Sequence, residues 1–320
     1  MHSGSAARSA RFSGLKFSLS VGMLRNLHWH RLLWLTLLVL ALLAAGCHRD
    51  VVAPGDPVAA VKGLAQALHD NDLVRYWRLS MPPALQKQME ARWKNRLATA
   101  PAPTEQQEKD YARLMARLTA PDAETKLYKS LDPKLKKLET EIGSQWPMMQ
   151  TTAGIFIKGI IQANDKLSPA EKDHAKTVGI AVLDWAQPAV FTDRARAKQA
   201  ITVMTSTARE LALPTLAQAR ALELVPALEK FGVAFKGGKQ LGRIYGVDVD
   251  AALAGVDAKL AAVNGDVATM DVSYPLLGKT VSFQMELIRR DGRWYSADAV
   301  RDAETELATP VPATPVHVVP

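Results

Sequence analysis

The sequence is poor in the residues that cross-link small secreted domains and that carry much of catalytic chemistry. Its 320 residues include 1 cysteine, Cys47, and 7 histidines, so a disulfide within one chain and a cysteine-based metal site are both excluded. Acidic residues are missing before Asp50, and the only long apolar run is Leu32 to Ala45, interrupted by Thr36. Because a membrane-spanning helix needs roughly 20 apolar residues, this run is too short for a stable membrane span.

The apolar run has the flanks of a secretory signal. Arg25 and Arg31 precede it, and the small residues Ala44 to Gly46 follow it, as in a signal peptide with a positive start and a small-residue cleavage site. A buried core helix is the alternative, but it does not account for the absence of acids before Asp50. We therefore expect residues 1–46 to be a signal peptide, with Met23 as the true translation start.

The stretch LAAGC, from Leu43 to Cys47, resembles the lipobox of bacterial lipoproteins, although Ala44 stands where leucine is commoner. The resemblance implies that diacylglycerol is joined to the Cys47 thiol, that the chain is cut before this cysteine, and that the acyl chains, such as palmitate, hold the protein to a membrane. In such lipoproteins an aspartate after the cysteine retains the protein in the inner membrane. Because His48 follows here, the resemblance implies the outer membrane, with the protein facing the periplasm.

The charge of the chain lies largely in the expected signal. The full sequence has 40 Lys and Arg against 32 Asp and Glu, but residues 1–46 carry five of the basic residues and no acid. The remainder has 35 basic and 32 acidic residues, a net charge of only +3. Nucleic-acid binding, which needs a concentrated basic face, is therefore not expected.

Most of the chain after Cys47 has the pattern of capped helices. We expect a tether over 47–56 and a helical region over 57–247. Asp56 and Pro57 start the first helix, while Thr104 with Gln107, and Ser168 with Glu171, form capping boxes for two later ones. The apolar stretch Met148 to Ile161 is expected to be the most buried helix, with contact to a partner or lipid as the alternative. GGKQLGRIYG, Gly237 to Gly246, is expected to be a flexible connector.

The period of the sequence changes near residue 256. Ala268, Met270, Val272 and Tyr274 alternate on one face, and Val281, Phe283, Met285 and Leu287 repeat the pattern. The pairs Asn264–Gly265 and Asp291–Gly292 are typical hairpin turns. We expect an α+β meander over 248–302 and a Pro-rich, disordered tail over 303–320. The predicted fold class is therefore α+β, mainly α, with a helical body followed by a small C-terminal antiparallel β-sheet.

The first helix and the closing meander together resemble the two ends of the nuclear-transport-factor-two-like fold, a cone of curved antiparallel sheet wrapped on helices. The resemblance covers about 20 residues at the front and about 45 at the back, and its motifs are generic. Two alternatives remain open for the helices between. The helices are either a large insertion in such a cone or the body of a helical domain that has a C-terminal sheet.

No catalytic or cofactor motif stands out. Gly278, Lys279 and Thr280 lack the earlier glycine of a phosphate-binding loop and precede a strand. His69 and His174 lie among acids in helix termini, and His174 is expected in an exposed first turn, so no metal site is predicted. Asp184, in an apolar stretch, is expected to be a hydrogen-bonded structural residue. We therefore predict no catalytic residue, no cofactor, no metal and no enzymatic activity.

The remaining function class is binding. Tyr76, Trp77, Trp294 and Tyr295 are candidates for an aromatic-lined ligand pocket if the first helix packs on the final strands, and filling of the core is the alternative. We expect a lipid-anchored binding or structural module whose partner is an envelope protein, peptidoglycan or a small apolar ligand. The alternative is a periplasmic enzyme or small-ligand binder that uses the aromatic pocket.

Overall fold

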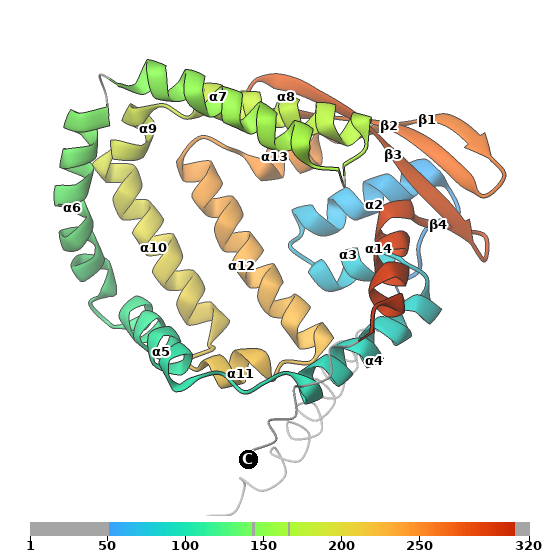
Figure 1. The fold of residues 1–320 in the computed structure, drawn as a ribbon, viewed down its shortest axis with the longest axis horizontal. Coiled ribbons are helices and arrows are strands. Elements are labelled where there is room, and N and C mark those ends of the chain that lie inside the picture. Colours follow the sequence, from blue (N-terminus) through green and yellow to red (C-terminus); the bar gives the residue numbers. More distant parts are fainter. Residues whose placement is uncertain (1–50, 143–144, 166, 311–320) are drawn as a thin grey trace, which may run out of the picture. The chain divides into compact units, whose positions relative to one another are not determined.

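The computed structural model describes residues 51–142, 145–165 and 167–310, so Cys47 and the expected signal lie outside the described residues. A mainly helical body is followed by a small antiparallel sheet, which confirms the predicted α+β, mainly α fold class (Figure 1). The helices are α2 Pro57–His69, α3 Leu73–Ser80, α4 Pro83–Thr99, α5 Glu105–Thr119, α6 Ala123–Ile142, α7 Trp146–Ala163, α8 Pro169–Trp185, α9 Pro188–Thr192, α10 Arg194–Leu211, α11 Leu216–Arg220, α12 Leu224–Ile244, α13 Val249–Ala254 and α14 Ala297–Ala308.

The helix starts follow the capping signals of the sequence. The Asp56 carboxylate accepts a hydrogen bond from the Ala59 N–H at 2.7 Å. Both expected capping boxes form, at Thr104 with Gln107 and at Ser168 with Glu171. Each cap satisfies backbone N–H groups that have no partner inside the helix, so these starts are fixed locally.

The sheet is a meander in the order β1-β2-β3-β4. Its strands are β1 Asp257–Asn264, β2 Val267–Leu276, β3 Lys279–Arg290 and β4 Arg293–Ser296. The turns at Gly265 and Asp291–Gly292 have the positive φ angles that the two hairpin signals predict. Met270, Val281 and Leu287, on the expected apolar face, are fully buried, so the alternation correctly identifies the core side.

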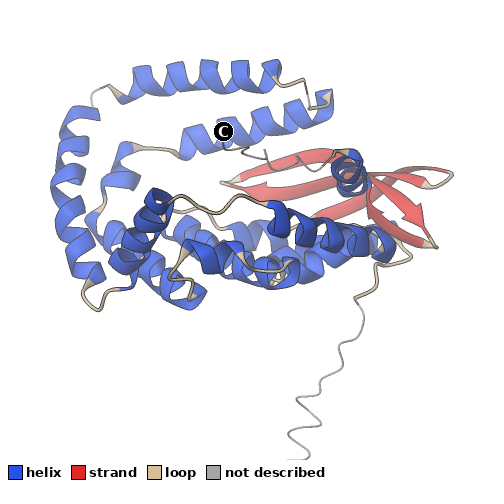
Figure 2. Ribbon diagram, turned by 60° about the horizontal axis from the view of Figure 1, so that its bottom comes forward, coloured by secondary structure: helices blue, strands red, loops and turns tan. Residues whose placement is uncertain are grey.

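Two apolar clusters connect the sheet to the first helices. One joins Leu64 and Leu79 to Tyr295 and Val300 of the C-terminal end, and the other joins Val61 to Met270 and Trp294. Helix α2 therefore packs on the closing strands although more than 180 residues separate them in the sequence. Figure 2 shows the sheet at one side of the helices, and α2 contacts β1, β2 and β4.

The segment before α2 is attached to the sheet. The Trp294 N–H donates to the Pro54 carbonyl at 3.0 Å, and the Arg293 guanidinium donates to the Ala53 carbonyl at 3.1 Å. Ala53 itself is buried in the core. Residues 51–55, expected as part of a tether, are thus held along β4 by backbone hydrogen bonds and packing.

The stretch Gly237 to Gly246 differs from the expected connector, because most of it continues α12 as far as Ile244. A Cβ atom on Gly237 would collide with Thr207 Oγ1 of α10, and one on Gly232 would lie 2.5 Å from the Asn71 carbonyl oxygen. These glycines allow close approach of other segments to the helix. Their role is packing and not flexibility.

Two further boundaries differ from the expected ones. Helix α6 continues through Pro133, although the sequence Asp132–Pro133 predicts a helix start there, and it buries Ala123 before the proline and Leu135 after it. Packing on both sides offsets the roughly 3 kcal/mol that an interior proline costs. At the C-terminus, α14 extends to Ala308, beyond residue 303, because Val300 and Ala303 pack into the core.

Candidate functional site

An apolar cavity of about 440 Å³ lies between α2, α13 and the core face of the sheet. Leu64, Leu68, Val249, Leu253, Phe283 and Met285 are among the residues that line it. The lining contains no acidic or basic side chain, and its polar side-chain atoms belong to two tyrosines, Tyr76 and Tyr274. The volume falls in the range of about 300–1,000 Å³ that is usual for small-molecule sites, and the chemistry of the lining suits an apolar ligand.

His174 marks the edge of this cavity. Its Nε2 atom lies 2.9 Å from the Tyr274 hydroxyl, and its ring stacks on Phe283 with centroids 4.6 Å apart. Burial lowers the pKa of His174 and raises the pKa of Tyr274. Both groups therefore favour their neutral forms near pH 7, and the pair links α8 to β2 without a formal charge.

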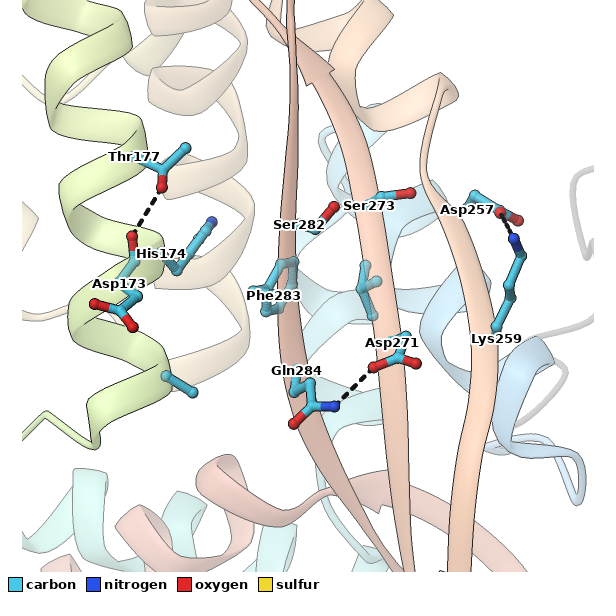
Figure 3. A pocket seen from close by; sticks show the side chains of 12 residues that line it. Asp173, His174, Thr177, Asp257, Lys259, Asp271, Ser273, Ser282, Phe283 and Gln284 are labelled. Carbon is cyan, nitrogen blue, oxygen red and sulfur yellow. Dashed lines mark hydrogen bonds and ion pairs between the residues drawn. The ribbon is translucent and has the colours of Figure 1, made fainter.

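A polar pocket of about 580 Å³ lies on the other side of this contact, between α8 and the sheet (Figure 3). Phe283 lines both cavities. Around the polar pocket the Gln284 amide donates to Asp271 at 2.8 Å, and Lys259 lies 3.6 Å from Asp257. These charged groups already have partners within the sheet, so the pocket presents a solvated, mixed-charge surface.

Helix α8 contacts the part of β3 that has no pairing with β4. Strand β4 pairs only with Leu287–Arg290 of β3, and α8 packs against β3. The ring of His174 of α8 contacts the rings of Phe283 and Tyr274, and Figure 3 shows His174 facing Phe283. Ser273 and Ser282 also line the polar pocket, and neither hydroxyl has a hydrogen bond to His174 in the described structure.

The four aromatic candidates do not surround one cavity. Tyr76 lines the apolar cavity, while Trp77 packs beside the cluster that contains buried Tyr295. Trp294 is buried in the other cluster, with Met270. The structure therefore brings these residues to the same region of the fold but divides them between a cavity wall and two parts of the core.

Asp184 lies on the surface and not in an apolar interior. Its carboxylate forms an ion pair with Lys279 at 2.7 Å, and more than half of the side chain is exposed. The GKT sequence lies at the turn between β2 and β3, where Gly278 has φ +76°. Asp184 is therefore not a buried acid, and the GKT sequence does not form a phosphate-binding loop.

The sequence-based interpretation missed His174 as a site residue. It places His174 in an exposed helical turn, whereas the ring is half-buried against the sheet. The signal that could have indicated the burial of His174 is its helical spacing. Thr177 and Ala181 follow at three and seven residues, and Ala181 is fully buried. His174 thus belongs to the face of α8 that packs inward.

Helix α7 presents the largest departure from the expected burial. None of its residues is buried, whereas its apolar sequence predicts the most buried helix. Its inner side, with Gly154 and Ile157, packs on α8. On its outer side, large apolar residues have exposed fractions of 65–69 %, namely Met148, Ile155, Phe156 and Ile160.

Helices α7 and α8 lie side by side in both views (Figure 1, Figure 2). Helix α7 contains no Asp or Glu, and its one basic residue is Lys158. Any acid near the exposed face therefore belongs to another segment. We call the exposed side chains of Met148, Ile155, Phe156 and Ile160 the α7 apolar face. Large exposed apolar side chains grouped on one element are typical of interaction surfaces.

The described residues form neither a metal-binding cluster nor a membrane-spanning helix. Within residues 51–310, as far as the structure describes them, no three His, Cys, Asp or Glu side chains gather as metal ligands would. Over the same described residues, no helix combines the length and apolarity that crossing a membrane requires.

Three comparisons with known proteins, against family models, curated sequences and solved structures, found no match for this chain.

Proposed function

We propose that this chain is a lipid-anchored binding module of the bacterial envelope, attached through acylated Cys47 to the outer membrane and facing the periplasm. Its task is to hold an envelope protein, and the α7 apolar face is the contact surface. The nuclear-transport-factor-two-like cone remains part of this proposal, as the frame in which α2 and the meander enclose the apolar cavity. The lipobox LAAGC supports the anchor, and the exposure of α7 supports the binding role.

The observation that carries the proposal is an 18-residue apolar helix with no buried residue. Fully burying a large apolar side chain stabilises by about 1.5–3 kcal/mol. Covering the four most exposed side chains of α7, each about two-thirds exposed, would therefore contribute on the order of 4–8 kcal/mol to a complex. Aromatic and methionine side chains are enriched at the centres of such interfaces.

A protein is a better partner for α7 than the anchoring membrane. The first described residues, 51–55, are held along β4, and β4 pairs with the C-terminal part of β3. Helix α8 packs against α7 and lies near the N-terminal part of β3, where Phe283 contacts His174. The anchor would thus attach near one end of this strand, and α7 lies toward the other end.

Binding is favoured over catalysis by the character of the cavities. A buried acid with a perturbed pKa inside an apolar pocket would indicate an enzyme. The apolar cavity instead has no acid in its lining, and Asp184 is exposed and paired with Lys279.

A second candidate function is the binding of a small apolar ligand, and the 440 Å³ cavity beside α2 supports it. In this case Tyr274, held by His174 at 2.9 Å, would orient the ligand. Peptidoglycan is a weaker candidate partner, because its sugars would need hydrogen-bonding groups that this lining does not offer.

The anchor is tested by labelling with a palmitate analogue in a bacterial host. The wild-type chain is expected to take up the label and to fractionate with the outer membrane, and Cys47→Ser is expected to lose the label. An unlabelled wild-type chain that stays in the inner membrane as precursor would disprove the lipoprotein assignment.

The contact surface is tested by photo-cross-linking of the full chain in cells. A photoreactive residue at Ile155 is expected to give one discrete protein adduct that disappears when Phe156→Asp is added. The matched control places the photoreactive residue at Gln106, an exposed position of α5. Adducts only with lipid, only with a second copy, or equally from both positions would contradict a protein partner at α7.

A further inference from the structure

A second apolar cavity, distinct from the sheet and from α7, lies where α4, α5, α10, α11 and α12 meet. We call it the α11 cavity, and its volume is about 470 Å³. Figure 1 shows α11 between α5 and the start of α12, with α4 beside them. Contacts between α11 and α5, and between α12 and α4, agree with this view.

Two large aromatic side chains, Trp93 and Tyr111, line the cavity, and their polar atoms already form hydrogen bonds to backbone carbonyls. The Trp93 indole N–H donates to the Leu222 carbonyl at 2.9 Å, and the Tyr111 hydroxyl donates to the Leu213 carbonyl at 2.9 Å. Both side chains therefore offer only ring surface to the cavity. Phe231 also lines it and is 57 % exposed, so a large apolar ring is left uncovered at the rim.

All charged residues in the lining have the same sign. They are Arg96, Arg220 and Lys230, and none of the lining residues is acidic. Arg96 shares a single carboxylate, that of Glu306, with Arg92. Arg220 donates to the neutral Pro101 carbonyl at 2.8 Å.

Lys230 is the least satisfied of the three cations. It is half-buried, and the described residues provide it with no hydrogen bond and no ion pair. A neutral apolar ligand would remove water from this ammonium group without replacing it, which is costly for a charged group. An anionic group beside Lys230 would pair with its ammonium group and would also be attracted by the guanidinium groups of Arg96 and Arg220.

We infer that the α11 cavity is a binding site for an anionic amphiphile, a single acyl-type chain with a carboxylate or phosphate head. The tail lies against the rings of Trp93, Tyr111 and Phe231, and the head lies at Lys230, within reach of the basic rim. The inference goes beyond the proposed envelope partner and does not depend on the lipid anchor, because every residue involved lies between α4 and α12.

The test uses the purified full chain, with a diazirine analogue of dodecanoate as the photo-cross-linking probe. Labelled peptides are expected from α4, α11 and α12. Dodecanoate and dodecyl phosphate should compete, and dodecanol should compete about tenfold less well, as expected for loss of one charge-assisted hydrogen bond. The stronger of the two anions identifies the head group.

Lys230→Met is expected to weaken competition by dodecanoate about tenfold while leaving dodecanol unchanged. The matched control is Lys236→Met on the same helix, whose ammonium pairs with Glu210 outside the cavity. Ala234→Phe, at an exposed position of the lining, should fill the cavity and abolish labelling. Melting by circular dichroism verifies folding, and the pair of lysine variants decides the matter if Ala234→Phe does not fold.

Four results would overturn the inference. The first three are equal effects of Lys230→Met and Lys236→Met, dodecanol competing as well as dodecanoate, and labelling spread over the chain without enrichment at α4, α11 and α12. Competition by inorganic phosphate at the concentrations where dodecanoate competes would also overturn it, because an anion site without a tail would then explain the binding.

Discussion

Lys239 connects three helices from a position that is almost fully buried. Its ammonium group donates to the carbonyls of Leu68 and His69 at the C-terminus of α2, at 3.2 and 2.6 Å, and pairs with Asp250 of α13. These acceptors include the last carbonyls of a helix, which favour a cation. One side chain thus satisfies backbone groups of α2 and a carboxylate of α13.

Removing this ammonium group should destabilise the fold strongly. Lys239→Met removes the side-chain donor of the His69 carbonyl and leaves Asp250 paired with Arg243 alone, and we expect a loss of about 2–4 kcal/mol in the free energy of unfolding, because one partner of a buried pair is removed. Lys236→Met, in the exposed ion pair with Glu210, should change it by less than about 1 kcal/mol. Urea unfolding measures both, and equal values would refute the structural role of Lys239.

His174 should make stability depend on pH. Its pKa in the folded chain is lowered by burial, so between that value and about 6.5 the unfolded chain binds a proton that the folded chain does not. Stability therefore falls as the pH drops from about 7 through 6.5 toward the folded pKa. Asp173, its neighbour, pairs with Lys176 at 3.3 Å and is largely exposed.

In His174→Gln this contribution should be absent. Urea unfolding at pH 7 and pH 5 should show a smaller loss of stability on acidification for the variant than for the wild-type chain. A larger loss in the variant would mean that the imidazole is protonated in the folded state, contrary to its buried contact with Phe283.

At the scale of elements, the two adjacent glycines of α12 offer a matched pair. Gly237 is buried against Thr207, and a Cβ added there would have three atoms of that side chain within 3.1 Å, whereas nothing lies within 4 Å of a Cβ on Gly238. Because rotation of Thr207 moves Oγ1 but not its Cβ, Gly237→Ala should cost about 1–3 kcal/mol by overpacking. Gly238→Ala should stabilise by about 0.5–1 kcal/mol through helix propensity.

Thermal unfolding of the two variants distinguishes packing from flexibility as the reason for these glycines. If α12 were loose at this point, both substitutions would stabilise the chain alike. Opposite signs are expected, since only Gly237 faces α10.

The elements that the sequence predicts correctly are those specified by local signals. Caps such as Asp56 and Ser168 act within one turn of their own helix, and the alternation of β2 and β3 follows from the two-residue period of a strand. The burial of α7 and the continuity of α12 depend on residues distant in sequence. Apolarity alone does not show whether a helix is covered, and Gly237 cannot be interpreted without Thr207.

The same limit applies to the candidate site. Tyr76 lies on the expected cavity, because α2 and the meander pack as the pattern suggests. His174 meets Phe283 because α8 packs beside β3, a fact of tertiary structure that no spacing within α8 contains.

At the scale of the whole molecule, the attachment of residues 51–55 to β4 limits how far the body can lie from an acylated Cys47. Four residue steps separate Cys47 from Val51, which is at most about 14 Å of extended chain. Gly55 lies beside Gly292 of the turn between β3 and β4, and the chain runs from there along β4 to Val51, which packs with Val300 and Ala303 of α14. If the lipid anchor is present, α14 should therefore lie close to the bilayer, and α7 should lie farther away.

This orientation can be measured because Cys47 is the only cysteine and is consumed by acylation, so an introduced cysteine is labelled alone. A fluorophore at Glu304→Cys, at an exposed position of α14, should be quenched strongly by a quencher attached to lipid head groups. The same fluorophore at Lys158→Cys, on the exposed side of α7, should be quenched weakly. Stronger quenching at position 158 would place the α7 apolar face on the membrane and replace the protein partner by lipid, because the depth of a label reports which surface the bilayer covers.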